Sequence, residues 1–182
     1  ILNWLESEVI KIEKVEPDAI RHLAALLVEN KTDVGEIANL LRLSNAQKKR
    51  LKSLLYPEMS IDADVDDAAV HQAIRHFGHT QVRDLTLFSW AHELCQADGL
   101  LESRRETYIR ILKQCAQWIP PEFPISGHDV LALGEKPGPI VGEILRYTEI
   151  WWENTGYTAD HEDCINQVKS MLIDRVQLDS SK

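Results

Sequence analysis

The stretch between residues 123 and 145 holds two signals for the start of a helix, separated by a short apolar run. Ser126, followed three residues later by Asp129, is a capping-box pattern, in which the carboxylate accepts the N–H of the serine. Pro139 follows Gly138, and proline is preset for the first position of a helix. Two neighbouring helix starts leave unpaired N–H donors and two positive dipole ends, which together can bind phosphate. The stretch therefore predicts a phosphate-binding surface and not a catalytic centre.

Other pairs of reactive residues have suggestive spacings, but each fits a structural role better. Asp62 and Asp64 have the spacing of a two-metal site, yet they lie in a polar connector with no apolar strand before them, and we interpret them as solvated acids. His128 and Asp129 form the dipeptide of helical metal-dependent phosphohydrolases, but they stand at a helix start, where the carboxylate is needed as a cap. His161 and Cys164 have the spacing of metal ligands, but no second ligand pair accompanies them. His92 and Cys95 could be a base and a nucleophile, but no oxyanion donors lie near them in the sequence, and we interpret them as packing residues.

The elements that position these residues are all predicted to be helices. Apolar residues recur at helical spacing in every long segment, and no segment alternates as a strand would. The pattern predicts an all-α fold, an array of roughly nine or ten packed helices. Helices are expected near residues 20–27, 34–41, 45–55, 66–77, 81–97 and 108–119, between 126 and 134, from 139 through 152, and near 160–176.

Local signals are expected to set the helix ends. Asp33 with Glu36 caps one helix, the next begins at Ser44 or Asn45, and Pro57 ends it. Gly78 and Gly99 break two later helices, and Gly134 ends the short helix in a left-handed conformation.

The acidic connector at residues 57–66 is the best internal boundary in the chain. It separates a helical neck at 1–56 from a helical body and tail at 67–176, followed by a disordered tail at 177–182. The length of 182 residues and the 44% hydrophobic content suit one good-sized core or two small ones.

Several of these motifs, taken in order, resemble the C-terminal part of the CCA-adding tRNA nucleotidyltransferase and poly(A) polymerase family. The resemblance covers most of the chain, from about Ala19 to about Val168. Trp151 and the Asn-Thr-Gly-Tyr at 154–157 look like the alphaproteobacterial version. The family's signature is matched by Gly-His-Asp at 127–129, Leu-Ala-Leu-Gly at 131–134, Pro-Gly-Pro at 137–139 and Gly-x-x-Leu at 142–145, and its helix junction by Arg-Leu-Ser-Asn at 42–45.

The resemblance implies a poly(A) polymerase C-terminal-like fold without the catalytic α/β head, because no strand-borne aspartate pair is present in this sequence. The complete enzyme would transfer CMP and AMP from CTP and ATP to a tRNA 3′ end with Mg²⁺, by CCA addition or polyadenylation. This chain alone would be inactive and would hold no cofactor. Because it does not begin with Met, we expect it to be part of a longer polypeptide that carries the head.

The implied partner is tRNA, held at the acceptor and TψC region through phosphate contacts. The net charge of −9 restricts such contacts to patches: residues 21–54 hold seven Lys or Arg against three acids, whereas residues 56–69 hold five acids and no base. The family more often has Arg or Lys where this chain has His128, so we expect this contact to be weaker here or to require a protonated imidazole. The predicted RNA-binding residues are Gly127, His128, Lys136, Gly138, Arg42, Lys48 and Lys49.

Residues 33–55 also resemble a helix-turn-helix, so a helical interaction domain that binds DNA remains the alternative. The adjacent basic residues at 48–50 spread over most of a helix's circumference, and this favours a helix that faces solvent or tRNA phosphates.

The remaining features indicate a cytoplasmic protein with no membrane partner. The sequence contains no run of about 18 apolar residues and no signal peptide. Trp151 and Trp152 continue an apolar stripe and are expected in the core. Three widely spaced cysteines, Cys95, Cys115 and Cys164, are expected to be buried free thiols.

Overall fold

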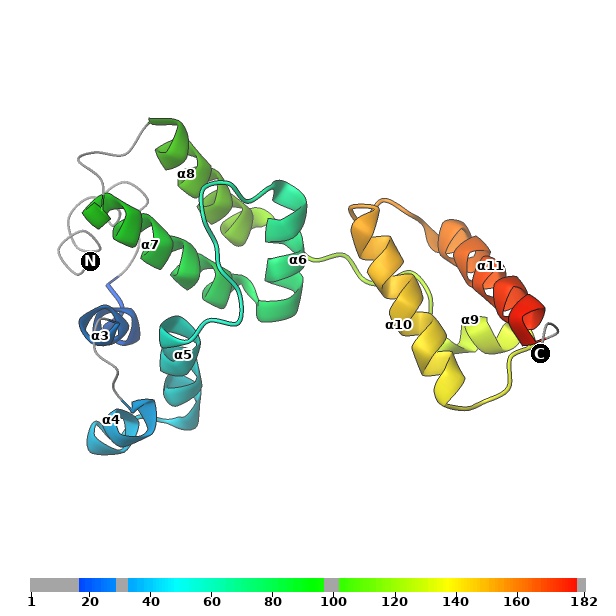
Figure 1. The fold of residues 1–182 in the computed structure, drawn as a ribbon, viewed down its shortest axis with the longest axis horizontal. Helices are drawn as coiled ribbons and strands as arrows, with labels where there is room; N and C mark the ends of the chain where they lie inside the picture. The colour runs from blue at the N-terminus through cyan, green and yellow to red at the C-terminus, as the bar shows by residue number, and fades with distance from the viewer. Residues whose placement is uncertain (1–16, 29–32, 97–101, 180–182) are drawn as a thin grey trace. The chain divides into compact units, whose positions relative to one another are not determined.

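The computed structural model describes residues 17–28, 33–96 and 102–179. Within these ranges all regular structure is helical and no strand is present, so the fold is all-α, as the sequence predicts. The helices, labelled as in Figure 1, form two compact units, Ile1–Ile119 and Pro120–Lys182. None of the described helices combines the length and the apolar character that crossing a bilayer requires.

Six helices make up the described part of the first unit. α7 packs against α5, α6 and α8, and α3 and α4 both pack against α5 (Figure 1). Leu87 and Trp90 of α7 are at most 2% exposed, and the Trp90 ring stacks on Tyr108 of α8 with 5.7 Å between centroids. The helices are α3 (Ala19–Leu27), α4 (Val34–Leu40), α5 (Asn45–Leu55), α6 (Asp67–Phe77), α7 (His79–Gln96) and α8 (Glu102–Gln117).

Caps and a glycine set the helix ends in this unit. Ser44 and Gln47 form a reciprocal capping box at the start of α5, with N–H···O distances of 2.9 and 3.3 Å. Asp33 caps α4 by accepting the Gly35 N–H at 2.7 Å. Gly78, at a φ of 84°, ends α6, and α7 begins at the next residue. The break expected at Gly99 lies outside the described residues.

A buried ion-pair network joins α3, α5 and α7. Asp84 of α7 is completely buried and accepts from the Arg21 guanidinium at 3.0 Å and from Arg50 Nε at 2.7 Å. Arg50 also donates to Asp18, the N-cap of α3, at 2.7 Å. Arg21 is 1% exposed. Arg21 and Arg50, two of the seven basic residues counted in 21–54, therefore form internal ion pairs and add little to the surface charge.

The acidic segment between α5 and α6 packs onto the first unit. Ile61 is 1% exposed and belongs to the core, and the Val65 carbonyl accepts from the Arg110 guanidinium of α8 at 2.9 Å. Asp62 and Asp64 remain exposed, in agreement with their interpretation as solvated acids.

The compact units divide the chain after Ile119, whereas the predicted neck, connector and body limits stay a prediction.

The second unit contains α9 (Gly127–Ala132), α10 (Pro139–Asn154) and α11 (His161–Asp179) in its described part. All three pack on one another around a small core (Figure 1). Trp152 is 1% exposed, which confirms its expected place in the core, and its indole N–H donates to the Ala159 carbonyl at 3.0 Å. The disordered tail predicted at 177–182 is helical at 177–179, and the rest of it lies outside the described residues.

Candidate nucleic-acid interface

The Ser126–Asp129 capping box is present at the start of α9. The Asp129 carboxylate accepts the Ser126 N–H at 2.7 Å and the Ser126 hydroxyl at 2.8 Å. His161, the first residue of α11, lies 3.4 Å from its second oxygen. Hydrogen bonds from the Ser126 amide and hydroxyl, and then from His161, lower the pKa of Asp129 to about 2. The carboxylate is therefore ionised and engaged as a cap, which leaves it poorly suited to act as a catalytic base.

Gly127 and Gly138 stand at the starts of α9 and α10, and neither glycine is required by the fold. A Cβ on Gly127 would meet Val141 Cγ1 at 3.5 Å, an ordinary van der Waals distance. A Cβ on Gly138 would meet nothing within 4 Å, and its φ of 166° is extended backbone that any residue adopts. By contrast, Gly134 has a φ of 97°, so its conformation does favour glycine, as predicted for the end of α9. Neither a steric clash nor a left-handed backbone conformation thus explains why glycine occurs at positions 127 and 138.

The side chains around these two glycines face solvent. His128 and Lys136 are both exposed. Lys136 lies in the turn between α9 and α10, and its ammonium has no hydrogen-bond or ion-pair partner in the described part of the chain. The turn therefore offers a free positive charge two residues before the N-cap of α10.

The other predicted residues lie on the first unit. Arg42, in the turn between α4 and α5, is exposed and adopts a φ of 51°. Lys48 and Lys49 are exposed on α5, whereas Arg50 between them and Lys52 turns inward to Asp84. The structure thus divides the seven predicted RNA-binding residues between two groups, one on each unit.

A cleft of about 420 Å³ with a mixed lining that includes Glu58 and Phe77 adjoins α5 and contains one of these residues, Lys49. Lys52 lies one turn later on the same side of the helix, and Tyr56, His76 and Gln81 complete much of the lining. The spacing of the two lysines is visible in the sequence, but their placement beside His76 of α6 depends on how α5 and α6 pack. Lys52, Tyr56 and His76 are therefore candidate contacts that the sequence analysis did not assign to RNA.

The cysteines are free, but only two of the three are buried. Burial raises the pKa of Cys115 to about 11, and burial also raises the pKa of Cys164. The prediction of burial is wrong for Cys95, which lies near the end of α7 and is exposed.

Within the described ranges, no three His, Cys, Asp or Glu side chains come together as a metal site would need.

Comparisons with known proteins give partial matches. The mitochondrial CCA tRNA nucleotidyltransferase 1 of Mus musculus is 32% identical over 59 residues, and that of Homo sapiens is equally so. This similarity supports a distant relationship to that family. In both cases the match covers 32% of this chain but only 14% of the relative. An uncharacterized 28 kDa protein of Rhodospirillum rubrum, from the petA 5′ region, is 32% identical over 85 residues, 47% of this chain and 33% of that protein. No family model matches.

Proposed function

We propose that this chain is a tRNA-binding region of a nucleotidyltransferase, which holds tRNA while CMP or AMP is added to its 3′ end. The partial similarity to proteins named CCA tRNA nucleotidyltransferase supports this proposal. The chain contacts phosphates of the acceptor and TψC region without reading their sequence. Catalysis, with Mg²⁺, ATP and CTP, belongs to a head elsewhere in the same polypeptide.

The observation that carries the proposal is the pair of glycines at adjacent helix starts. Gly127 and Gly138 are not required by packing or by strained backbone. A glycine in such a position lets an approaching phosphate reach the backbone N–H groups, which a Cβ would obstruct. The exposed Lys136 then supplies the charge for the same phosphate group or a neighbouring one.

The glycines provide a test that separates binding from folding. Gly138→Ala puts a methyl group into open space, so it should leave the melting temperature nearly unchanged. The proposal predicts that tRNA affinity nevertheless falls several-fold, measured by fluorescence anisotropy with labelled tRNA. Unchanged affinity in a folded Gly138→Ala protein would remove this helix start from the interface.

Lys136→Glu tests the electrostatic part of the same surface. The charge reversal should weaken tRNA binding by about tenfold or more at low salt, and the loss should shrink as salt rises. Lys169→Glu is the matched control, because Lys169 is also exposed and lies on α11 of the same unit. Equal losses for the two variants would mean that net charge, and not the turn, governs binding.

The helix-turn-helix alternative is tested in the same experiment by duplex DNA. Arg50 would belong to the recognition helix, α5, yet its guanidinium is engaged by Asp84 and Asp18. Arg50 is therefore not available to contact DNA in a major groove, and α5 presents one basic side chain fewer for that purpose. Preference for duplex DNA over tRNA would nonetheless establish the alternative and refute the proposal.

A further inference from the structure

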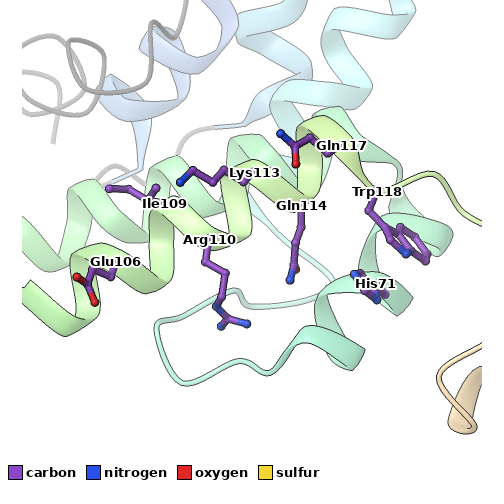
Figure 2. A pocket seen from close by; sticks show the side chains of 8 residues that line it. All are labelled: His71, Glu106, Ile109, Arg110, Lys113, Gln114, Gln117 and Trp118. Carbon is purple, nitrogen blue, oxygen red and sulfur yellow. The ribbon is translucent and has the colours of Figure 1, made fainter.

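A groove of about 730 Å³ runs along α8 in the first unit and has no part in the function proposed above. Figure 2 shows that most of its lining comes from successive turns of α8, while His71 of α6 closes the end near Trp118. Its size suits a nucleotide-sized molecule. Three features of the lining indicate what kind of molecule fits.

The first feature is a flat aromatic wall. The His71 and Trp118 rings are stacked, with 4.2 Å between centroids and 4° between their planes. Burial lowers the pKa of His71, so its imidazole is neutral at pH 7 and the wall carries no charge there. A neutral, flat, partly apolar wall favours a planar ligand such as a nucleobase.

The second feature is an amide with an unused acceptor. Gln114 lies one turn before Trp118, and its side chain points into the groove on the side of His71 (Figure 2). Its Oε1 is buried and accepts no hydrogen bond. Buried acceptors are normally satisfied, so a turn of the amide that brings Oε1 to the groove would let a donor of a ligand complete this one. A glutamine amide matches the amino edge of adenine, which presents an N–H donor beside a ring-nitrogen acceptor.

The third feature is the distribution of charge along α8. The Arg110 guanidinium is already held by the Asp67 carboxylate and the Val65 carbonyl. Lys113, next to Gln114, is exposed and has no hydrogen-bond or ion-pair partner among the described residues. Glu106 lies seven residues earlier, about 10 Å away along the helix axis. The groove therefore has a free cation at Lys113, whose side chain extends in the direction of Ile109 (Figure 2), about two helical turns from Glu106.

We propose that this groove binds an adenine nucleotide, either free or as an unpaired residue of an RNA strand. The base packs at the His71–Trp118 wall, its amino group donates to Gln114 Oε1, and its phosphate lies at Lys113. The site is independent of the phosphate contacts proposed for Gly127, Gly138 and Lys136. It would add recognition of a base to a chain whose other proposed contacts are with the nucleic-acid backbone.

The test is a titration of the 182-residue chain with AMP, UMP and inorganic phosphate, followed by calorimetry and by the ¹H NMR signals of His71. AMP should bind saturably at millimolar concentration or below and shift the His71 signals, whereas UMP and phosphate should bind about tenfold more weakly. A short oligoadenylate that binds more tightly than AMP assigns the site to RNA, and equal affinity assigns it to the free nucleotide.

Two variants connect the binding to the named residues. Gln114→Leu, nearly equal in volume, should remove the preference for AMP over UMP. Lys113→Gln should weaken AMP but not adenosine, and Lys169→Gln on the second unit is the matched control. Circular dichroism checks that each variant is folded.

Absence of saturable AMP binding by the folded chain would overturn the proposal, and so would AMP affinity that Gln114→Leu leaves unchanged. The same measurements distinguish failure of this proposal from failure of the proposed function. A folded chain that binds AMP but not tRNA would refute only the tRNA proposal. A folded chain that binds tRNA but not AMP would refute only the groove proposal.

Discussion

Asp84 is the residue on which three helices of the first unit converge. It is completely buried and holds two guanidinium groups, Arg21 and Arg50. Asp84→Asn keeps the shape but removes the charge that compensates them, so we expect the free energy of unfolding to fall by about 3–5 kcal/mol in urea denaturation followed by circular dichroism. Asp64→Asn, at an exposed carboxylate, should cost less than about 1 kcal/mol. Similar costs for both variants would contradict the account of the network.

Asp129 gives a prediction about pH. Its pKa in the folded chain, about 2, lies below the ordinary value of 3.8. A depressed pKa means that the folded state favours the ionised carboxylate, so the cap contributes its full stability above about pH 4 and loses it as the pH falls towards 2. A ¹³C NMR titration of the Asp129 carboxyl group should therefore give a pKa near 2. A value near 3.8 would show that the cap does not hold this carboxylate in solution.

Single residues also show where sequence reasoning stops. The Ser126–Asp129 cap could be predicted because both partners lie within one helical turn. The inward turn of Arg50, by contrast, depends on Asp84, 34 residues further along the chain. The stacking of His71 on Trp118 likewise joins α6 to the end of α8. Contacts of this kind are set by helix packing, which the apolar periodicity does not specify in detail.

Among the elements, α9 and α10 offer a matched pair of glycine substitutions. Gly134 follows α9 with a φ of 97°, so Gly134→Ala should destabilise the second unit by about 1 kcal/mol. Gly142 lies inside α10, where a Cβ would meet nothing within 4 Å, so Gly142→Ala should stabilise it by about 0.5–1 kcal/mol. Thermal unfolding monitored by tryptophan fluorescence measures both changes. A stabilising Gly134→Ala would contradict the described end of α9.

The helices themselves were largely predictable, because their ends carry local signals. Ser44 begins α5 and Pro139 begins α10, as the sequence indicates. Differences arise where tertiary contacts decide. The segment at 57–66 looked like a solvated connector, yet Ile61 within it is buried in the core. Cys95 looked like a core position but lies on the exposed side of α7.

At the scale of the whole molecule, two small cores support the candidate surfaces separately. The first unit carries Arg42, Lys48 and Lys49, and the second carries the α9–α10 turn with Lys136. Since the chain has a net charge of −9, binding to a polyanion should rely on these local patches and be strongly reduced by salt. The resemblance of the motifs pointed to tRNA, but the sequence alone could not show that a Cβ at Gly127 or Gly138 would meet no steric clash.

The most direct test is a titration of the chain with tRNA and with duplex DNA of similar length over a series of salt concentrations. The account predicts saturable tRNA binding that weakens linearly in log–log form as salt rises, and an affinity at least about tenfold above that for duplex DNA at each salt concentration. No binding to tRNA by the folded chain, or a preference for duplex DNA, would contradict it.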